Sequence, residues 1–291
     1  MLHFIYNSKA DACKKSFLQK LEKKLRKAGA QYDMIDPEEH GGLEAFVRKV
    51  TSEEENPTLV AVGGDGTVNV LLSALPDPSR VTLGLIPAGT GNDFAKAARI
   101  PRGLKALKLI LGREPKKTDY LEDESGHRSM NIAGLGIDVD ILERYEASRR
   151  AGKRGAGLYY KCLLASLRKY EAVPMRVVFD GEEHSYNALI AVGCNGQYFG
   201  GGIRICPAAK LDDGLMDLVV VEFPKRSKIF YYLIKLKLGK ILKVKIAHHV
   251  RCTSAQIYPE GTERVQFDGE LISLPALKLR VVQSGLKLYR G

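Results

Sequence analysis

The sequence has no apolar run of the roughly 18 residues that a membrane-spanning helix requires, so we do not expect an integral membrane protein. Its start, Met1 to Asn7, places no basic segment before an apolar stretch, and no secretory signal is expected. The cysteines are scattered and form no CxxC pair, which favours reduced, mostly packed thiols in a cytosolic protein. They are Cys13, Cys162, Cys194, Cys206 and Cys252.

Several motifs of nucleotide and metal chemistry are also missing. The sequence contains no GxxxxGK followed by Ser or Thr, which argues against a P-loop. Neither glycine-rich segment has the GxGxxG spacing of a dinucleotide-binding turn, and the HRD and DFG motifs of protein kinases do not occur. No HExxH motif and no local cluster of cysteine and histidine predicts zinc. Most of the six histidines are therefore expected to be structural or solvated.

The net charge is strongly positive. Lys and Arg number 45 against 34 Asp and Glu, which gives +11 at pH 7 and a pI of about 9.3. Such a field attracts anions such as nucleotides, acidic membranes or nucleic acid, and solubility alone would explain it equally well. Because no aromatic–basic motif of the usual nucleic-acid-binding modules accompanies the charge, no nucleic-acid partner is predicted.

The first part of the chain alternates between strand-like and helix-like segments. Strands are expected at residues 2–6, 31–35, 59–62 and 81–86. Helices are expected at residues 16–28, 43–50 and 68–75, and from about Asp93. Strands that alternate with helices are typical of a parallel α/β sheet.

The pattern changes after about Asp119. Strand-like runs then dominate, at residues 175–179, 186–192, 215–223, 250–258, 264–267 and 276–282. Asp180-Gly181 and Asp268-Gly269 interrupt them and indicate hairpin turns. Helices are expected near residues 141–167 and 227–243. We therefore predict a second, mainly antiparallel domain.

The segment Gly63-Gly64-Asp65-Gly66-Thr67 directly follows an apolar strand. A strand, a glycine turn and a helix together can hold phosphate, because glycines allow close backbone approach and the N–H groups of the helix point at the anion. A carboxylate at Asp65 would repel phosphate unless a cation or a proton-bearing group of a substrate lies between them. The alternative is a tight turn in which Asp65 caps a helix.

The segment from Pro87 to Phe94, PAGTGNDF, repeats this arrangement after the next strand. Neighbouring parallel strands would bring both glycine turns to one carboxyl edge of the sheet, where ligands bind in open α/β sheets. Asn7-Ser8-Lys9, after the first strand, would join the same edge. The sequence therefore predicts a phosphate-binding site at this edge.

GGDGT followed by PAGTGNDFA resembles the diacylglycerol kinase catalytic domain, as found in soluble bacterial lipid kinases and in sphingosine and ceramide kinases. The resemblance continues through KLDDGLMD at residues 210–217 and FDGE at residues 267–270, and so covers nearly the whole chain. It implies a Rossmann-like α/β ATP-binding domain at residues 1–120, to which a last strand at residues 284–291 returns. Residues 121–283 would form an antiparallel β-sandwich that takes the acceptor.

The same resemblance implies an activity and its partners. It implies phosphorylation of a lipid alcohol such as diacylglycerol, with ATP and Mg²⁺ as cofactors. A cytoplasmic enzyme in peripheral contact with the inner face of the membrane is expected, and a homodimer is left open. The sequence does not name the lipid.

Individual residues take roles from the resemblance. Glu270 matches the general base, and Asp65 matches the carboxylate that approaches the catalytic magnesium. Asp213, with the carbonyl oxygens of Lys210 and Leu215, matches a structural magnesium site, for which a solvated turn is the alternative. The positions that match nucleotide contacts are Asn7, Lys9, Gly63, Gly64, Gly66, Thr67, Thr90 and Asn92.

Two positions depart from the family pattern. Ser8 stands where a proline is common, and Val70 stands where GGDGTxNE has its glutamate. Loss of that carboxylate would weaken activity or change the metal geometry, and it leaves open a nucleotide-binding regulator without turnover. An NAD kinase-like enzyme or a sugar kinase is a further alternative, because related folds share GGDGT. The TGND version of the second turn and the late DGE favour the lipid branch.

Two further features stay undecided from the residues alone. Phe-Asp-Gly-Glu occurs at residues 179–182 and again at 267–270; both read as hairpin turns, and only the resemblance favours the second as catalytic. Two basic stretches, residues 149–154 and 235–245, are candidates for contact with an anionic membrane. For the second stretch, a solvated helix face over a packed core is the alternative.

Overall fold

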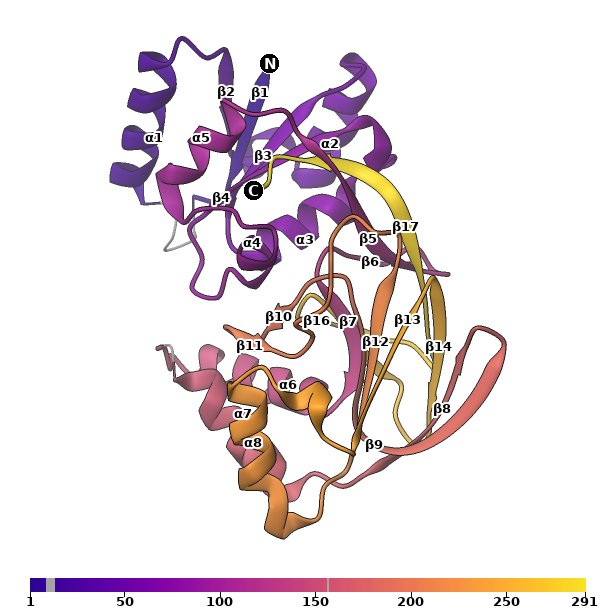
Figure 1. Cartoon of the computed structure of the whole chain (residues 1–291). Coiled ribbons are helices and arrows are strands. Elements are labelled where there is room, and N and C mark those ends of the chain that lie inside the picture. The colour runs from indigo at the N-terminus through magenta and orange to yellow at the C-terminus, as the bar shows by residue number, and fades with distance from the viewer. Residues whose placement is uncertain (9–13, 156) are drawn as a thin grey trace.

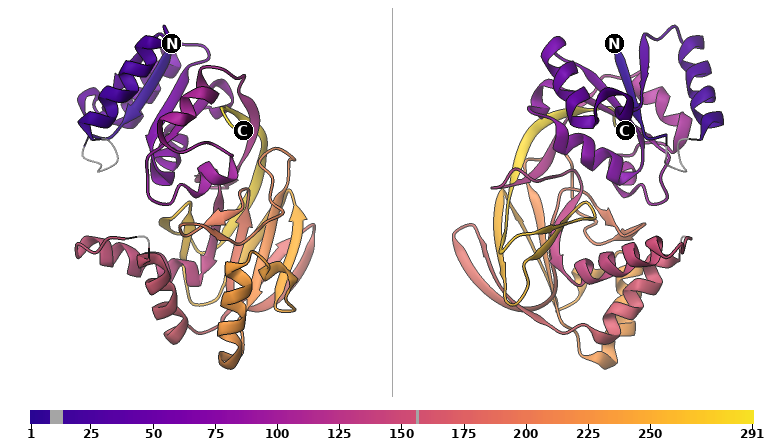
Figure 2. Two further views of the ribbon diagram at one scale, coloured as in Figure 1. Left: turned by 60° about the vertical axis from the view of Figure 1, so that its left-hand side comes forward. Right: turned by 180° about the vertical axis from the view of Figure 1, so that it is seen from behind.

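The structure of the chain is a computed structural model that describes residues 1–8, 14–155 and 157–291 (Figure 1). An α/β domain formed by the N-terminal part lies above a β-rich domain in this view, and three helices pack on one side of the β-rich domain. Figure 2 shows the same two domains from two other sides, with the C-terminal strand passing from the lower to the upper one. The predicted fold class is confirmed.

The first domain is built on a parallel sheet in the order β2-β1-β3-β4. Its strands are β1 (Leu2–Tyr6), β2 (Tyr32–Ile35), β3 (Thr58–Gly63) and β4 (Thr82–Pro87). The two central strands, β3 and β4, are buried nearly throughout, as expected of parallel strands covered on both faces. Gly63 pairs with Pro87, so the carboxyl ends of β3 and β4 lie side by side. This register brings the two glycine turns together.

Helices cover this sheet, and those at residues 15–27, 43–53, 65–74 and 93–97 lie where the sequence predicts them. In the first helix, Leu21 and Leu25 are buried, and Gly29 ends the segment with a φ of 65°. The helices are α1 (Lys15–Lys27), α2 (Leu43–Glu53), α3 (Asp65–Ala74), α4 (Asp93–Ala97) and α5 (Leu107–Ile110). Short 3₁₀ turns are η2 (Pro37–His40), η3 (Pro78–Arg80) and η4 (Gly103–Ala106).

A pair of antiparallel strands, β5 (Lys116–Asp123) and β17 (Leu277–Leu288), joins the two domains. β17 pairs with β14 (Ser254–Pro259) of the second domain near its start and with β4 of the first domain near its end. Between these ends the register shifts, and Ser284 has a φ of 52°. The buried Asp119 fastens this irregular point, because its carboxylate accepts hydrogen bonds of 2.7 Å from the N–H groups of both Ser284 and Gly214.

The second domain is mainly antiparallel and has two cores. On β12 (Met216–Glu222), Leu218 and Val220 point into the core inside the β domain, and Val219 and Val221 point into a core under the helices. The other strands are β6 (Arg128–Ser129), β7 (Ile132–Gly136), β8 (Val173–Phe179), β9 (Glu182–Cys194), β10 (Tyr198–Phe199), β11 (Ile203–Arg204), β13 (Ala247–Cys252), β15 (Arg264–Phe267) and β16 (Glu270–Ser273).

Three helices form the second core with the outer face of this sheet: α6 (Ile137–Arg150), α7 (Leu158–Lys169) and α8 (Ile229–Lys237). The expected helix at residues 141–167 is corrected to two helices, because Gly152 and Gly155 between them take φ angles of 81° and 120°. The expected helix at residues 227–243 is shorter. It is α8, flanked by the 3₁₀ turns η5 (Arg226–Lys228) and η6 (Ile241–Lys243).

The repeated tetrapeptide Phe-Asp-Gly-Glu forms the same turn twice. Between β8 and β9, Asp180 and Gly181 have φ angles of 51° and 81°; between β15 and β16, Asp268 and Gly269 have φ angles of 51° and 90°. Positive φ at both central residues is typical of a type I′ hairpin turn. Both predicted hairpins are confirmed.

The surroundings of the two turns differ. Asp180 is exposed, whereas Asp268 accepts four hydrogen bonds from the segment that leads into β7. The donors, at 2.6–3.0 Å, are the hydroxyl of Ser129 and the N–H groups of Met130, Asn131 and Ile132. Desolvation raises the pKa of Asp268 to about 6, and the four donors oppose this shift. The second hairpin is therefore anchored at its turn.

We expect Asp268→Asn to lower the free energy of unfolding by about 2–4 kcal/mol, because an amide loses charge-assisted bonds and turns its own N–H groups toward N–H donors. Asp180→Asn, in the identical tetrapeptide, should change it by less than about 0.5 kcal/mol. Chemical and thermal unfolding of both variants measures the difference. Equal destabilisation by the two substitutions would contradict the anchoring role of Asp268.

Candidate active site

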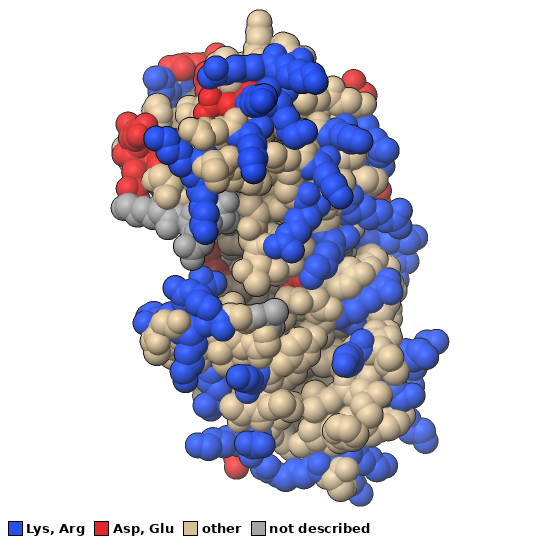
Figure 3. Space-filling view, turned by 90° about the vertical axis from the view of Figure 1, so that its left-hand side faces the viewer, with Lys and Arg blue, Asp and Glu red and all other residues tan. Residues whose placement is uncertain are grey.

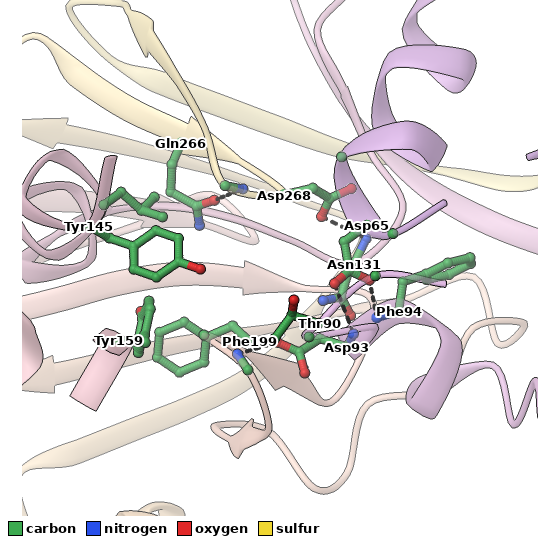
Figure 4. Close-up of a pocket in the computed structure, with 18 of the residues that line it drawn as sticks. Asp65, Thr90, Asp93, Phe94, Asn131, Tyr145, Tyr159, Phe199, Gln266 and Asp268 are labelled. Atoms are coloured by element: carbon green, nitrogen blue, oxygen red, sulfur yellow. Dashed lines mark hydrogen bonds between the residues drawn. The ribbon is translucent and has the colours of Figure 1, made fainter. Parts of the chain in front are cut away.

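A cleft of about 740 Å³ lies between the two domains. Its lining combines the glycine turns after β3 and β4 with parts of α6, the β10–β11 loop and the β15–β16 hairpin. Figure 3 shows a hollow at mid-height, with Lys and Arg around its mouth and acidic atoms within. In Figure 4, Asp65 and Asp93 lie at one end of the cleft, and Tyr145, Tyr159 and Phe199 lie at the other. The cleft thus has a polar end and an aromatic end.

The polar end is built from the two glycine turns. A Cβ atom on Gly89 would lie 2.6 Å from the Cα of Gly64, so the two backbones are in direct contact and a larger residue would separate them. α3 starts at Asp65, immediately after the Gly63-Gly64 turn. Its first N–H groups have no acceptor within the helix, and this helix end carries a partial positive charge. The polar end is therefore suited to an anion.

Asp65 links the two turns. Its two carboxylate oxygens accept hydrogen bonds of 3.0 Å from the N–H groups of Asp93 and Phe94, at the start of α4. Desolvation raises the pKa of Asp65, and these two bonds oppose the shift. Asp65 does act as a helix cap, but for the following helix rather than its own. It also lines the cleft.

Part of the predicted nucleotide-contact set lies in the cleft lining: Gly64, Gly66 and Thr90. Gly63 and Thr67 lie together at the base of the first turn, because a Cβ atom on Gly63 would overlap the Thr67 side chain. Asn7 is exposed after β1, at the same carboxyl edge of the sheet. Lys9 lies outside the described residues.

Asn92 supports the second turn from inside. Its Nδ2 donates a 2.7 Å hydrogen bond to the carbonyl oxygen of Gly89, and the residue is buried. No described residue donates a hydrogen bond to its Oδ1. A buried acceptor without a donor is rare and indicates a place where a ligand or ion completes the site.

Glu270 stands at the start of β16, directly after two turn residues, Asp268 and Gly269, that line the cleft. Its Oε2 accepts a 3.1 Å hydrogen bond from Nδ2 of the buried Asn69, and the same amide lies 3.3 Å from the carbonyl oxygen of Phe267. Asn69 belongs to α3, so the helix that begins at the first glycine turn also holds the hairpin of Glu270. Glu270 itself is exposed, and its role as a base stays a prediction.

Asp138 is a second carboxyl group in the lining, in the first turn of α6. Its side chain is buried, with the residue 1% exposed. Its Oδ1 accepts a 3.0 Å hydrogen bond from the N–H of Val139, and no described residue donates a hydrogen bond to its Oδ2. Burial raises the pKa of Asp138 to about 7, opposed by Val139 and by the neighbouring amide of Gln266. Gln266 in turn accepts a 2.9 Å bond from the N–H of Gly269. A polar chain thus connects Asp138 to the hairpin that carries Glu270.

The aromatic end borders a second cavity. The rings of Tyr145 and Tyr159 pack edge to face at 6.0 Å, and those of Tyr159 and Phe199 at 6.4 Å. Tyr159 and Phe199 also line a small cavity of about 70 Å³ beneath α7 and α8, whose accessible wall is entirely apolar. The same two rings therefore separate the cleft from an apolar chamber.

The predicted structural magnesium site lies in the loop before β12. Oδ1 of Asp213 accepts a 3.3 Å bond from the N–H of Leu215, while its other oxygen is paired with the guanidinium of Arg251. Arg251 therefore occupies one side of the carboxylate that a magnesium ion would need. The ion assigned to Lys210, Asp213 and Leu215 stays a prediction.

The sequence analysis did not identify Asp138, Asn69 or Asp268 as parts of the site. Asp138 carried a readable signal, because β7 ends at Gly136, with a φ of 121°, and α6 follows at once. This is a third turn of the strand–glycine–helix kind. The roles of Asn69 and Asp268 could not be recognised from the neighbouring sequence, since they depend on partners far away in the chain.

The residues present fit a nucleotide with its magnesium ion. The two glycine turns and the N-terminus of α3 can surround phosphate oxygens closely. Asp65 and the unpartnered Oδ1 of Asn92 are hard oxygen donors, the kind that Mg²⁺ prefers.

Comparison with known proteins agrees with this geometry. Residues 1–122 match the family described as "Diacylglycerol kinase catalytic domain", and residues 131–290 match "YegS C-terminal NAD kinase beta sandwich-like domain". "Probable lipid kinase YegS-like" of Xanthomonas euvesicatoria pv. vesicatoria is 36% identical over 209 residues, which are 68% of this chain and 66% of that protein. The match thus spans slightly under two thirds of that relative's length.

Two further comparisons extend over more of the chain. "Diacylglycerol kinase" of Mycobacterium tuberculosis is 29% identical over 232 residues, 75% of this chain and 74% of that protein. The crystal structure of a diacylglycerol kinase from Bacillus anthracis strain Sterne superimposes with a TM-score of 0.80 at 27% identity, covering 100% of this chain and 96% of that one. From the matched domains and the shared fold, the chain belongs to the diacylglycerol kinase catalytic-domain family.

Proposed function

We propose that the protein transfers the γ-phosphate of ATP to the hydroxyl group of a lipid alcohol such as diacylglycerol. The observation that carries this proposal is the composition of the cleft. Two contacting glycine turns form one end, aromatic rings next to an apolar cavity form the other, and Glu270 follows the hairpin turn that lines it. The names of the relatives support the same class of reaction.

The first domain would bind the triphosphate. Phosphoryl transfer depends mainly on positioning and on stabilising the negative charge that spreads over the phosphate oxygens. The backbone of Gly64 and Gly66 and the hydroxyl of Thr90 are placed for the first task, and the N-terminus of α3 contributes to the second. Mg²⁺, held by Asp65 with Asn92 beside it, would neutralise phosphate charge when bound.

The second domain would provide the base. Glu270 would accept the proton of the acceptor hydroxyl as the oxygen attacks phosphorus, a role that contributes roughly 10²–10⁴-fold in rate. The hydrogen bond from Asn69 fixes the direction of its carboxylate, and the anchored turn at Asp268 fixes its backbone. Both constraints keep the base at one place relative to the phosphate site.

The acceptor would enter the aromatic end. Asp138 can accept a hydrogen bond from a polar head group there. Below about pH 7, where its carboxyl is protonated, it can also donate a hydrogen bond. The apolar part of the acceptor would lie against Tyr159 and Phe199 and reach the cavity beneath α7 and α8. An entirely apolar wall suits an acyl chain better than a second nucleoside, which disfavours the NAD kinase-like and sugar kinase alternatives.

A nucleotide-binding regulator remains the second alternative, and Val70 motivates it. Val70 is 49% exposed on α3, next to Asn69, at the position where the family has a glutamate. A regulator would bind ATP but release no phosphorylated product. An assay of phosphate transfer distinguishes this regulator from the lipid kinase.

A lipid substrate requires contact with a membrane, and we propose that α7 and α8 provide it. No helix in the described parts of the chain is long and apolar enough to cross a bilayer. On α8, Phe230 is 75% exposed, with Tyr231 and Ile234 on the same side, and Leu238, directly after this helix, is 60% exposed. On α7, Leu164 is 49% exposed. In Figure 3 the lower half of the molecule shows uncharged surface bordered by Lys and Arg. An apolar stripe with a basic border suits the cytoplasmic, anionic face of a membrane.

The first prediction of the proposed function concerns phosphate transfer. With labelled ATP and a panel of lipid alcohols in mixed micelles, we expect the wild-type chain to produce a labelled lipid. Glu270→Gln should lower kcat by about 10²–10⁴-fold, while Glu182→Gln, in the other Phe-Asp-Gly-Glu hairpin, should keep it. Equal turnover of Glu270→Gln and wild type would refute the role of the base. ATP binding without any labelled product would refute the proposed kinase activity.

The second prediction concerns pH. The native state keeps the proton of Asp138 up to about pH 7, whereas the unfolded chain releases it near 3.8, so stability falls as pH rises between these values. Asp138→Asn removes this loss, and we expect its advantage in unfolding free energy over wild type to grow by about 2–3 kcal/mol from about pH 5 to about pH 8.

Asp140→Asn is the matched control on the same helix. Desolvation raises the pKa of Asp140, but the hydrogen-bonded ion pair with Arg144 and the nearby polar side chain of Ser166 outweigh it and leave the pKa lowered. Asp140 is thus ionised in both states over this pH range, and the effect of its substitution should not change with pH. Thermal melts of both variants across the range measure this, and a pH-independent effect of Asp138→Asn would contradict the assignment.

The third prediction concerns the membrane. The protein should float with vesicles that contain anionic lipid, and less so as salt increases, because each basic residue near the surface adds about 1 kcal/mol that salt screens. The double substitution Phe230→Ser and Leu238→Ser should reduce flotation strongly. Leu111→Ser, at a 40% exposed leucine of the first domain, is the control and should not. Undiminished flotation of the α8 variant would exclude this face as the membrane-binding surface.

A further inference from the structure

A cluster of three metal-ligating side chains lies in the second domain, outside the cleft lining. The ligand atoms of Cys206, Asp217 and His249 all lie within 4.8 Å of one another. They come from three separate segments, the loop after β11, strand β12 and strand β13. Short-range sequence motifs therefore could not predict the cluster.

The register of the sheet explains how the cluster forms. Asp217 on β12 pairs with Cys194 on β9, and Val219, two residues further along β12, pairs with His249 on β13. Side chains two positions apart on a strand share a face, so these groups point to the side covered by the helices. Figure 1 shows β12 and β13 side by side in this region. The loop after β11 brings Cys206 onto the same face, where it joins the apolar core.

The cluster is buried and incompletely bonded. Cys206 is 0% and Asp217 1% exposed, and the side chain of His249 is 25% exposed. Nε2 of His249 lies 2.5 Å from Oδ1 of Asp217. No described residue donates a hydrogen bond to Oδ2 of Asp217. A buried carboxylate oxygen without a partner carries a desolvation cost that a bound cation would offset.

A second thiol adjoins the first. Cys194 is buried and lies close enough to Cys206 for a thiol–thiol hydrogen bond. Burial raises the pKa of the Cys194 thiol well above its usual value. Because thiolate is the form of cysteine that binds metal, a metal ion would bind here by displacing thiol protons.

We propose that Cys206, Asp217 and His249, with Cys194 as the fourth ligand, form a zinc-binding site. Zn²⁺ accepts sulfur, imidazole nitrogen and carboxylate oxygen, and its structural sites take four such ligands in a tetrahedron. With Zn–S near 2.3 Å and Zn–N near 2.0 Å, such ligand atoms lie roughly 3.3–3.8 Å apart. The ligand atoms of Cys206, Asp217 and His249 lie within 4.8 Å of one another, and binding would have to draw them together while opening the 2.5 Å contact between His249 and Asp217. The thiol of Cys194, which neighbours Cys206, would have to turn toward the other ligands.

The charges at the cluster are compatible with a divalent cation bound by two thiolates. Two thiolates, one carboxylate and a neutral imidazole around Zn²⁺ leave one net negative charge. Nε of Arg251 lies 4.0 Å from Oδ1 of Asp217 and would compensate it. Mg²⁺ would not suit this site, because it prefers oxygen ligands. The site is therefore distinct in chemistry from the hard-metal site predicted at Asp213.

A zinc ion here would tie the segment from Cys206 to Asp217 to the central strands of the second domain. The loop between them includes Gly214, whose N–H is bonded to Asp119 between the domains. The expected effect is therefore on stability rather than on the chemical step of transfer.

Cobalt absorption tests the proposal directly. The full chain, stripped of metal under reducing conditions, is titrated with Co²⁺ and then with Zn²⁺. We expect binding of a single Co²⁺ per chain, with the near-ultraviolet band that reports thiolate ligation and the strong visible bands of a tetrahedral site, and loss of both when Zn²⁺ is added. The melting temperature should rise with zinc concentration.

Three variants make the test specific. Cys206→Ala and His249→Gln should each lose the tetrahedral spectrum and the zinc-dependent rise in melting temperature. Cys162→Ala, at a buried cysteine of the same core, is the control and should keep both. No thiolate band at excess Co²⁺ would overturn the proposal, as would an unchanged spectrum in His249→Gln, a partly exposed position where folding should persist.

Discussion

One carboxylate fixes the spatial relation of the two phosphate-binding turns. Asp65 begins α3 and, through both oxygens, binds the N–H groups at the start of α4. The backbones of Gly64 and Gly89 consequently stay in contact. A ligand that needs both turns meets a surface that is already formed, so little conformational entropy is lost on binding. The rest of the site is arranged around this fixed pair of helices.

The second domain contacts the same two helices. Asn69 of α3 bonds to Glu270, and Asp93 of α4 accepts a 2.6 Å hydrogen bond from the N–H of Gly201, in the loop between β10 and β11. The helices that present the phosphate site therefore also position the β domain. Displacement of either helix would alter the phosphate-binding and acceptor sides of the cleft together.

Local signals predicted the parallel sheet, the glycine turns and both hairpins, because each depends on residues adjacent in the chain. The difference between the two Phe-Asp-Gly-Glu turns could not be predicted, since it depends on Ser129 and its neighbours, 139 positions before Asp268. Strand register likewise created the Cys206, Asp217 and His249 cluster, which no motif search would find. The break between α6 and α7 could have been predicted locally from Gly152 and Gly155, but the prediction gave more weight to the helical periodicity on either side of them.

The joint between the domains is a two-stranded ribbon rather than a flexible tether. β5 and β17 stay paired from Asp123 opposite Leu279 to Lys116 opposite Leu288, and the one interruption lies between Val282 and Leu286. A hydrogen-bonded ribbon resists sliding but can bend where its ladder is broken. Any relative movement of the two domains would therefore have to bend this ribbon near the interruption, where Asp119 bonds to the N–H of Ser284, instead of sliding one domain along the other.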